Sequence, residues 1–166
     1  MIVLGIDPGT ATTGFAVIIS EEKSQKPRVV DFGCIITKPL QSAGERLKKI
    51  HDEVNELIRE HNPDIISVES LYFFKNLKTA LPVSQAKGVI LLSAAKKNIP
   101  VLEFTPLQVK MTVVGYGRAE KKQVQEMIKQ SLDLSSFNLK EKERKKDDAT
   151  DALGIAICAA LKDPRY

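Results

Sequence analysis

Four acidic side chains have the residue type and the setting to form a metal site. Asp7 lies in the segment LGIDPGTATTGFAVI, Glu69 closes the segment IISVES, and Asp148 and Asp151 lie in DDATDALGIA. Carboxylates that a fold brings close together either bind a divalent metal ion or repel one another. The sequence therefore predicts that these acids hold metal if the elements around them converge.

Each acid also has an ordinary explanation. Asp7 could cap a turn through its own backbone, and Glu69 could pair with a lysine. Asp147, Asp148 and Asp151 could complement the dipole of a helix, because acids are common in a first helical turn. Separate strands and a final helix need not converge, so the metal site is a hypothesis at this point.

The first two acids stand at the ends of predicted strands. Asp7 follows the apolar run 2–6, and Pro8-Gly9 then supplies a turn before a second β-rich run, 12–19. This pattern is typical of a hairpin with an acid at its bend. Glu69 closes the apolar run 65–68, where a charge at the exit of a buried strand is costly unless it is paired or bound to metal.

The other two acids stand at the start of a predicted helix. Asp148 and Asp151 are three residues apart, which places both carboxylates on one helical face. An apolar pattern at helical spacing follows them, and we expect it to face the core. Its members are Leu153, Ile157, Ala160 and Leu161.

The rest of the chain alternates predicted helices and strands. A third strand over 29–37 extends the hairpin into an antiparallel meander. Ser42 and Glu45 form a capping box, and Thr105-Pro106 is typical of an N-cap followed by proline at the first helical position. The other predicted elements are a helix from Thr79 or Val83 to Lys97 that Pro82 interrupts near its start, a strand over 101–104, a helix that ends at Val114, and a helix over 119–132 with Val124, Ile128 and Leu132 inward. This order predicts an α/β fold, a mixed sheet with helices on both faces.

Composition narrows the possible classes of protein. The chain has 166 residues, which predicts a single domain over 1–166. The formal net charge is +4 and the pI is about 9.0, a mild bias toward polyanionic partners. Cys34 and Cys158 lie far apart with no CxxC spacing, which disfavours a zinc site and a disulfide framework. No signal peptide and no apolar stretch of bilayer length are evident, so we expect a cytoplasmic protein that makes no membrane contact.

Two segments have open interpretations. The run KEKERKK over 140–146 is either a solvated loop or a mobile basic arm that touches phosphates. The helical stretch around 89–92 is more apolar all round than a surface helix should be. It is therefore either a core element or part of a contact with a second subunit.

The chain resembles a known family. The opening segment, the strand IISVES followed by aromatic residues and Lys75-Asn76, the block QVKMTVVGYGRAEKKQVQ and the closing DDATDALGIA are similar to the RuvC family of Holliday junction resolvases, in the same order and with similar spacing. The resemblance covers nearly the whole chain. It implies an RNase H-like fold with a mixed five-stranded sheet. It also implies a homodimer that acts in recombination and DNA repair, a structure-specific endonuclease that nicks paired strands of four-way junction DNA.

The resemblance also implies cofactors and further partners. Two Mg²⁺ ions would occupy each active site, with Mn²⁺ as a substitute, and the products would carry 5′ phosphates. The RuvAB branch-migration complex is an implied partner.

Residue by residue, the resemblance implies roles for positions of this chain. Asp7, Glu69, Asp148 and Asp151 would be catalytic and would bind the metal. Lys121 in AEK would be a catalytic residue that contacts DNA, and Lys110 in QVK would also contact DNA. Tyr72 stands three residues after the glutamate, where such resolvases commonly carry phenylalanine, and we expect it to stack on an unpaired base. Asp147 beside Asp148 leaves two candidates for the third carboxylate, and the DxxD spacing to Asp151 favours Asp148.

The chemistry of the residues agrees with this resemblance. A phosphodiester is hydrolysed readily when two metal ions about 3.5 to 4 Å apart hold the attacking and the leaving oxygen. Carboxylates are the protein ligands that Mg²⁺ prefers, and four of them suffice for two ions. A four-way junction has approximate two-fold symmetry, so an isologous dimer would present two such sites to strands of like polarity.

Three other functions are compatible with part of the sequence. Another RNase H-like nuclease, acting on structured or RNA-containing substrates, would share the carboxylates, but the QVK and AEK segments disfavour it. An actin-like ATPase shares the DxGT pattern of Asp7, Gly9 and Thr10 but needs two domains and a longer chain. A module that binds junctions without cutting them would have lost some of the catalytic acids, and all four acids are present here.

Overall fold

A five-stranded sheet forms the centre of the molecule. The computed structural model describes residues 1–21, 25–70, 77–135 and 147–162. The strand order is β3-β2-β1-β4-β5. The strands are β1 (Ile2–Asp7), β2 (Thr12–Ile19), β3 (Arg28–Ile36), β4 (Ile65–Glu69) and β5 (Val101–Phe104). The predicted strands are confirmed, with ends that differ from the predicted ones by a single residue at most.

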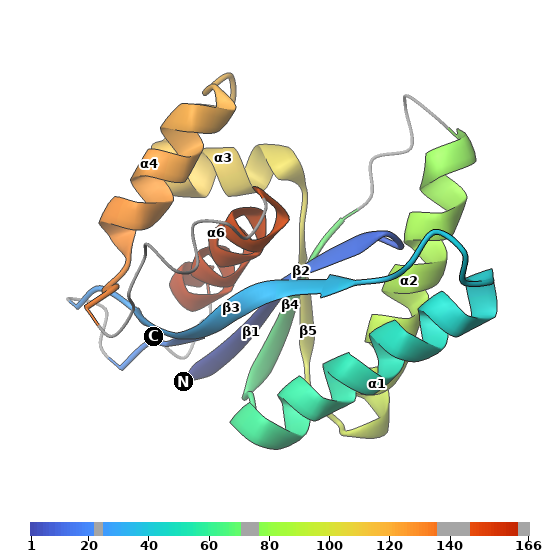
Figure 1. The fold of residues 1–166 in the computed structure, drawn as a ribbon. Helices are drawn as coiled ribbons and strands as arrows, with labels where there is room; N and C mark the ends of the chain where they lie inside the picture. The colour runs from blue at the N-terminus through green and yellow to red at the C-terminus, as the bar shows by residue number, and fades with distance from the viewer. Residues whose placement is uncertain (22–24, 71–76, 136–146, 163–166) are drawn as a thin grey trace.

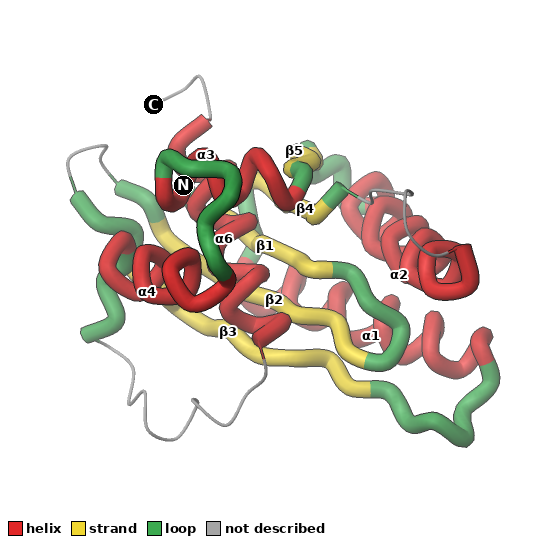
Figure 2. The backbone as a smooth tube through the Cα atoms, turned by 90° about the horizontal axis from the view of Figure 1, so that it is seen from above, coloured by secondary structure: helices red, strands yellow, loops and turns green. Residues whose placement is uncertain are grey.

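The sheet is mixed. β1, β2 and β3 form the predicted antiparallel meander and lie side by side in Figure 2. β4 pairs in parallel with β1, and β5 pairs in parallel with β4. Because parallel strands end at the same edge of a sheet, the last residues of β1 and β4 are neighbours. Those residues are Asp7 and Glu69.

Helices cover both faces of the sheet, as predicted (Figure 1). The helices α1 (Ala43–His61) and α2 (Leu77–Lys96) cover one face. The other face carries α6 (Asp147–Lys162), with α3 (Pro106–Val114) and α4 (Lys121–Ser131) packed against it. β1 is buried on both faces because Val3 packs into the core beneath α6, while Leu4 and Ile6 pack into the core beneath α1 and α2. This two-sided burial explains the continuous apolar run at the start of the chain.

The predicted caps are present. The side chain of Ser42 accepts a hydrogen bond from the Glu45 backbone at the start of α1, and the glutamate reaches back to the Ser42 N–H at 2.7 Å. Thr105 caps α3 in the same way, with Gln108 as its partner. α3 ends at Gly115, whose φ of 77° is the left-handed conformation that glycine adopts without strain.

Two details of the prediction were wrong. α2 begins at Leu77, before Pro82, and continues through it. Pro82 lies in the second turn of the helix, so the hydrogen bond that it removes is near the helix end rather than in the middle. Leu161 is 58% exposed, whereas Ala160 is buried. Leu161 lies in the last turn of α6, just beyond the continuously buried run 152–160.

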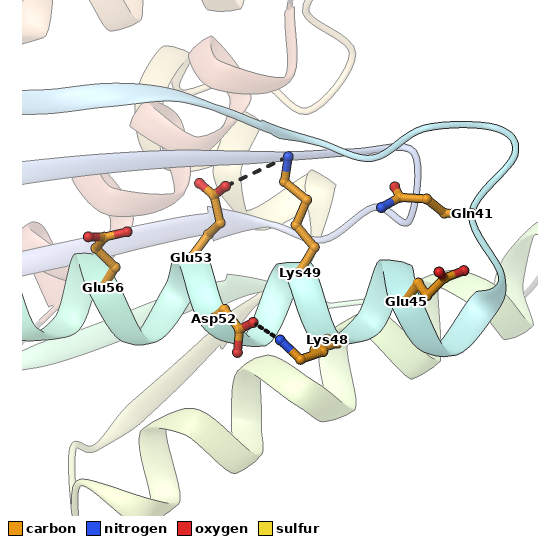
Figure 3. A pocket seen from close by; sticks show the side chains of 7 residues that line it. All are labelled: Gln41, Glu45, Lys48, Lys49, Asp52, Glu53 and Glu56. Carbon is orange, nitrogen blue, oxygen red and sulfur yellow. Dashed lines mark hydrogen bonds and ion pairs between the residues drawn. The ribbon is translucent and has the colours of Figure 1, made fainter.

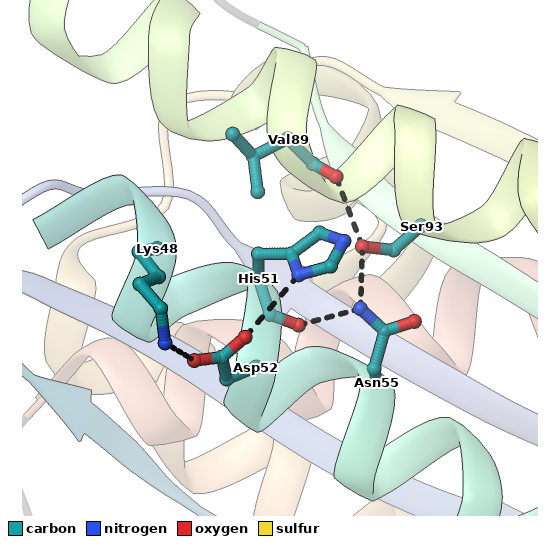
Figure 4. Close-up of polar contacts among 6 residues, drawn as sticks. All are labelled: Lys48, His51, Asp52, Asn55, Val89 and Ser93. Atoms are coloured by element: carbon teal, nitrogen blue, oxygen red, sulfur yellow. Dashed lines mark hydrogen bonds and ion pairs between the residues drawn. The ribbon is translucent and has the colours of Figure 1, made fainter. Parts of the chain in front are cut away.

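Polar contacts fix how α1 and α2 pack (Figure 4). Asn55 on α1 donates to the His51 carbonyl at 2.7 Å and approaches Ser93 Oγ on α2 at 3.4 Å. Ser93 is fully buried and donates to the Val89 carbonyl at 3.0 Å. These hydrogen bonds satisfy the polar groups within an otherwise apolar contact and hold α2 in register. Among the described residues, no helix combines the length and the apolar character that crossing a bilayer requires.

Candidate active site

Three aspartates converge at one edge of the sheet. Asp7 is the last residue of β1, and Asp148 and Asp151 lie in the first turns of α6. One carboxylate oxygen from each of these residues lies within 4.8 Å of the other two. Glu69, at the end of β4, adjoins this group and shares a hydrogen bond with the Asp7 carboxyl. The four acids that the sequence singled out therefore gather at one place.

Two glycines let α6 approach the sheet closely enough for this convergence. A Cβ atom at Gly14 would lie 2.0 Å from the Asp148 carbonyl oxygen, and one at Gly5 would lie 2.4 Å from the Ala152 carbonyl oxygen. Distances this short are not tolerated, so only glycine fits at either strand position. Gly14 is also the register partner of Asp7. The start of α6 therefore rests on the backbone beside the first aspartate.

The acids are held where full ionisation is unfavourable. Burial, together with the charges of Glu69, Asp151 and Asp148, raises the pKa of Asp7 to about 8. Burial also raises the pKa of Asp151, and nearby Lys121 opposes that shift. The pKa of Glu69 is raised as well, first by burial and then by the charge of Asp151. A cation at this position would relieve both the desolvation and the mutual repulsion.

Lys121 supplies one positive charge to the site. It stands at the start of α4, and its Nζ atom lies 3.2 Å from Oδ2 of Asp151 and 3.2 Å from Oδ2 of Asp147. Gln125, one turn further along α4, donates to Oδ1 of Asp147 at 3.2 Å. Asp147 thus ties α4 to α6 and stands outside the group of three converging aspartates.

Lys110 has a partner within the protein. Its Nζ atom donates to the Ala119 carbonyl at 2.8 Å and so links α3 to the segment that leads into α4. It also borders a cavity of about 240 Å³ that opens beside the acids. The cavity is lined by Glu69, Pro106, Val109, Lys110, Lys121, Val124, Asp151 and Ile155. A substrate group that entered here would meet both lysines and two of the acids.

The residues fit a divalent metal. Carboxylate oxygens that lie this close together make a hard ligand set of the kind that Mg²⁺ and Mn²⁺ prefer. The pKa of Asp7 is raised first by burial and then by the charges of the neighbouring acids, and a bound cation would offset both effects. The described part of the chain therefore contains an acidic group compatible with divalent metal binding.

A second hollow lies along α1 and has the wrong charge for a nucleic-acid site (Figure 3). It encloses about 420 Å³ and is lined by Gln41, Glu45, Lys48, Lys49, Asp52, Glu53 and Glu56. Both lysines are paired with acids one turn away, at 2.6 Å for Lys48 and 3.7 Å for Lys49. The acids that remain would repel phosphates, so this face is a solvated helix surface.

Most of the candidate residues are predictable from the sequence, and some are not. Tyr72 and the run 140–146 lie outside the described residues, so their roles stay predictions. Gly5 and Gly14 were missed, although the small residues of α6, such as Ala152 and Ala156, are the signal of a close helix–sheet contact. The pairing of Asp147 with Lys121 was also missed, because it joins two helices that are distant in sequence.

Comparison with known proteins places this chain in a family. Residues 3–159 match the model of the family described as crossover junction endodeoxyribonuclease RuvC. The protein of that name from Alkaliphilus oremlandii is 48% identical over 160 residues, which cover 96% of this chain and 93% of the relative. The one from Halothermothrix orenii is 47% identical over 158 residues, covering 95% and 91%.

Solved structures agree. The structure titled T. thermophilus RuvC in complex with Holliday junction substrate superposes with a TM-score of 0.85 at 31% identity, over 96% of this chain and 93% of that one. The yeast mitochondrial Holliday junction resolvase Ydc2 has a TM-score of 0.68 at 20% identity, over 98% and 81%, and so shares the fold. With this fold, these converging acids and these relatives, the chain belongs to the RuvC family of crossover junction endodeoxyribonucleases.

Proposed function

We propose that the protein is a structure-specific endonuclease that resolves Holliday junctions by metal-dependent nicking of paired strands. The convergence of Asp7, Asp148 and Asp151 within 4.8 Å is the observation that carries this proposal. Relatives at up to 48% identity bear the name of that activity, and a structural neighbour was solved with junction DNA. Recombination and DNA repair are the processes in which such cleavage is used.

We propose Mg²⁺ as the cofactor, two ions per site, with Mn²⁺ as a substitute. Asp7, Glu69, Asp148 and Asp151 would hold the ions. When bound, the ions would supply Lewis-acid chemistry, lowering the pKa of the attacking water and stabilising charge on the departing 3′ oxygen. The expected product is a nick with a 5′ phosphate.

The protein side chains would position the scissile phosphate and balance the charge around it. Lys121 would move from Asp151 to a phosphate oxygen and offset the negative charge that grows there. Lys110, anchored on the Ala119 carbonyl, would contact the DNA backbone at the rim of the same cavity. Tyr72 would stack on a base that the junction leaves unpaired, and the run 140–146 would add phosphate contacts.

A homodimer through α2 would present two sites to one junction. The outward face of α2 carries Leu81, 65% exposed, and Leu92, 49% exposed, with Gly88 and Ala95 exposed between and beyond them. This apolar stripe lies opposite the face that packs on α1 through Ala86, Ile90 and Ala94. Exposed apolar stripes of this kind mark helix–helix contacts. Light scattering that gave the 18.4 kDa monomer mass, with or without DNA, would contradict the dimer.

Three further features complete the proposal. The chain would act as a single domain over residues 1–166. It would work in the cytoplasm and would take junctions from the RuvAB branch-migration complex.

One assay tests the proposed activity. A synthetic four-way junction and a matching linear duplex are incubated with the protein, with Mg²⁺ present or absent. We expect paired nicks in the junction, none in the duplex, and no cleavage without metal. Equal cleavage of the duplex would instead favour a general RNase H-like nuclease, and tight binding without cleavage would indicate a module that only grips junctions.

A further inference from the structure

A partly exposed ion pair lies beside the end of β4. Glu103 is in β5, and its carboxylate oxygen Oε2 accepts hydrogen bonds from Lys87 Nζ on α2 at 2.6 Å and from Ser70 Oγ at 3.0 Å. We call these three residues the Glu103 cluster. It lies on the face of the sheet that carries α2, opposite α6, so the metal site does not include it.

The cluster holds the residue that follows Glu69. The backbone N–H of Ser70 donates to the Phe104 carbonyl at 2.8 Å, and its side chain donates to Glu103. Side chains alternate between the faces of a strand, so Glu69 points toward α6 while Ser70 points toward α2. Ser70 is therefore fixed by two hydrogen bonds at the point where β4 ends, a place where strands otherwise fray.

This ion pair is less exposed than the pair between Lys48 and Asp52 on α1. The side chain of Lys87 is 15% exposed and that of Glu103 is 41% exposed. Lys48 and Asp52 on α1 form a pair with the same 2.6 Å separation, but their side chains are 78% and 53% exposed. Solvent screens an exposed pair far more than a partly buried one. The hydrogen bond from Lys87 also lowers the pKa of Glu103.

We propose that Glu103 is a positioning residue for Glu69. Through Ser70 it fixes the end of β4, and through Lys87 it fastens that end to α2. Glu69 shares a hydrogen bond with Asp7, so a displaced strand end would disturb two of the acids together. The inference rests on the proposed function, because it assigns the cluster a role in holding the metal-binding glutamate. It also links this glutamate to the helix that carries the proposed dimer stripe.

Hydrogen exchange in the metal-free protein tests whether the Glu103 cluster fixes the end of β4, and it needs no cleavage assay. Glu103→Ala should speed exchange of the Ser70 amide by about fivefold to tenfold, the worth of one hydrogen bond. Asp52→Ala breaks the exposed pair on α1 and should leave the Ser70 amide unchanged. Glu103→Gln keeps an oxygen that Ser70 can donate to, so it should have a smaller effect than alanine. Unchanged Ser70 exchange in Glu103→Ala would overturn the proposal.

Metal titration tests whether the Glu103 cluster affects metal binding at the site. Glu103→Ala should raise the Mg²⁺ concentration that gives half-maximal junction cleavage, and it should weaken Mn²⁺ binding as measured by calorimetry. Both changes should be up to about tenfold, which is the lower end of the effect seen when a residue that supports a metal ligand is removed. Junction binding should change little. The double variant Lys87→Glu/Glu103→Lys should recover much of the loss that Lys87→Glu alone causes. Thermal unfolding of each variant identifies any that fail to fold, and Glu103→Gln then carries the test.

The two proposals can fail separately. If the natural protein cuts no junction, the proposed function is wrong, while hydrogen exchange and Mn²⁺ binding still report on the cluster. If the natural protein cuts and Glu103→Ala shows the same Mg²⁺ dependence and the same Mn²⁺ affinity, the positioning role is wrong. A swap variant that recovers nothing beyond Lys87→Glu would also count against it.

Discussion

The Nζ atom of Lys121, at the start of α4, lies 3.2 Å from Oδ2 of Asp151, on α6. Lys121 also contacts Asp147 at the same distance, so in the metal-free protein it partly balances two carboxylates. A metal ion that binds Asp151 would free the lysine for a phosphate. Lys121 is therefore expected to act after the substrate binds.

Lys121→Ala should depress turnover more than binding. Loss of one positive charge at the phosphate should lower the cleavage rate by roughly 10²-fold to 10³-fold, the range seen when a transition-state donor is removed. Junction affinity should fall by much less. Lys122→Ala, at the neighbouring exposed position of α4, is the matched control and should leave turnover near normal. Equal rates for the two variants in single-turnover cleavage would contradict the role.

Each of the four acids should be essential for cleavage. Removal of a metal ligand forfeits several kcal/mol of transition-state stabilisation, so Asp7→Asn, Glu69→Gln, Asp148→Asn and Asp151→Asn should each slow cleavage on the order of a thousandfold. Binding in gel-shift assays should persist or tighten, because each change removes negative charge from a surface that meets phosphates. Near-normal cutting by Asp7→Asn would exclude the proposed site.

Asp147→Asn should cost much less than Asp148→Asn. Asp147 contacts Lys121 and Gln125 and lies outside the group of converging aspartates. Its loss would loosen the link between α4 and α6 without removing a ligand. Junction cleavage by the two variants, side by side, measures the difference. If Asp147→Asn were inactive and Asp148→Asn active, the metal ligand would be Asp147 instead of Asp148.

Proton linkage should reveal the raised pKa of Asp7. Burial and the neighbouring acids raise the pKa of Asp7 in the folded protein to about 8, from an ordinary aspartate value of 3.8. The folded state therefore binds more protons than the unfolded chain across this window, and stability should fall as pH rises through it. Urea denaturation at several pH values should show this slope, and Asp7→Asn should flatten it. Metal binding near pH 7 should release a proton, detectable by calorimetry in buffers of different ionisation enthalpy.

Gly14→Ala should disable the site by moving α6. The added methyl would meet the Asp148 carbonyl oxygen at 2.0 Å, so the start of the helix must shift. A displacement of about 1 Å at a reacting centre costs on the order of a hundredfold in rate. Gly44→Ala is the control, because a Cβ there has nothing within 4 Å. Full activity in a folded Gly14→Ala variant, judged by circular dichroism, would show that the close approach is not required.

Local patterns in the sequence predicted most of the fold. Strand runs and capping boxes depend on neighbouring residues, so they could be predicted from the sequence. The meeting of Asp7 with Glu69 depends on the parallel pairing of β1 with β4, and its meeting with Asp148 depends on the approach of α6. Neither has a local signal. The need for glycine at position 14 follows from its short distance to α6, which the local sequence does not show. The continuation of α2 through Pro82 depends on packing that overrides the tendency of proline to end a helix.

The order of the elements along the chain has a consequence for synthesis. β1 contributes Asp7 and lies near the centre of the sheet, but its partners at the site come from β4 and from α6. Asp7 leaves the ribosome long before Asp148 and Asp151 are made, so a nascent or truncated chain that lacks α6 has no complete metal site. Because folding during translation proceeds from the N-terminus, nuclease activity would arise only after the whole sheet and its last helix have assembled.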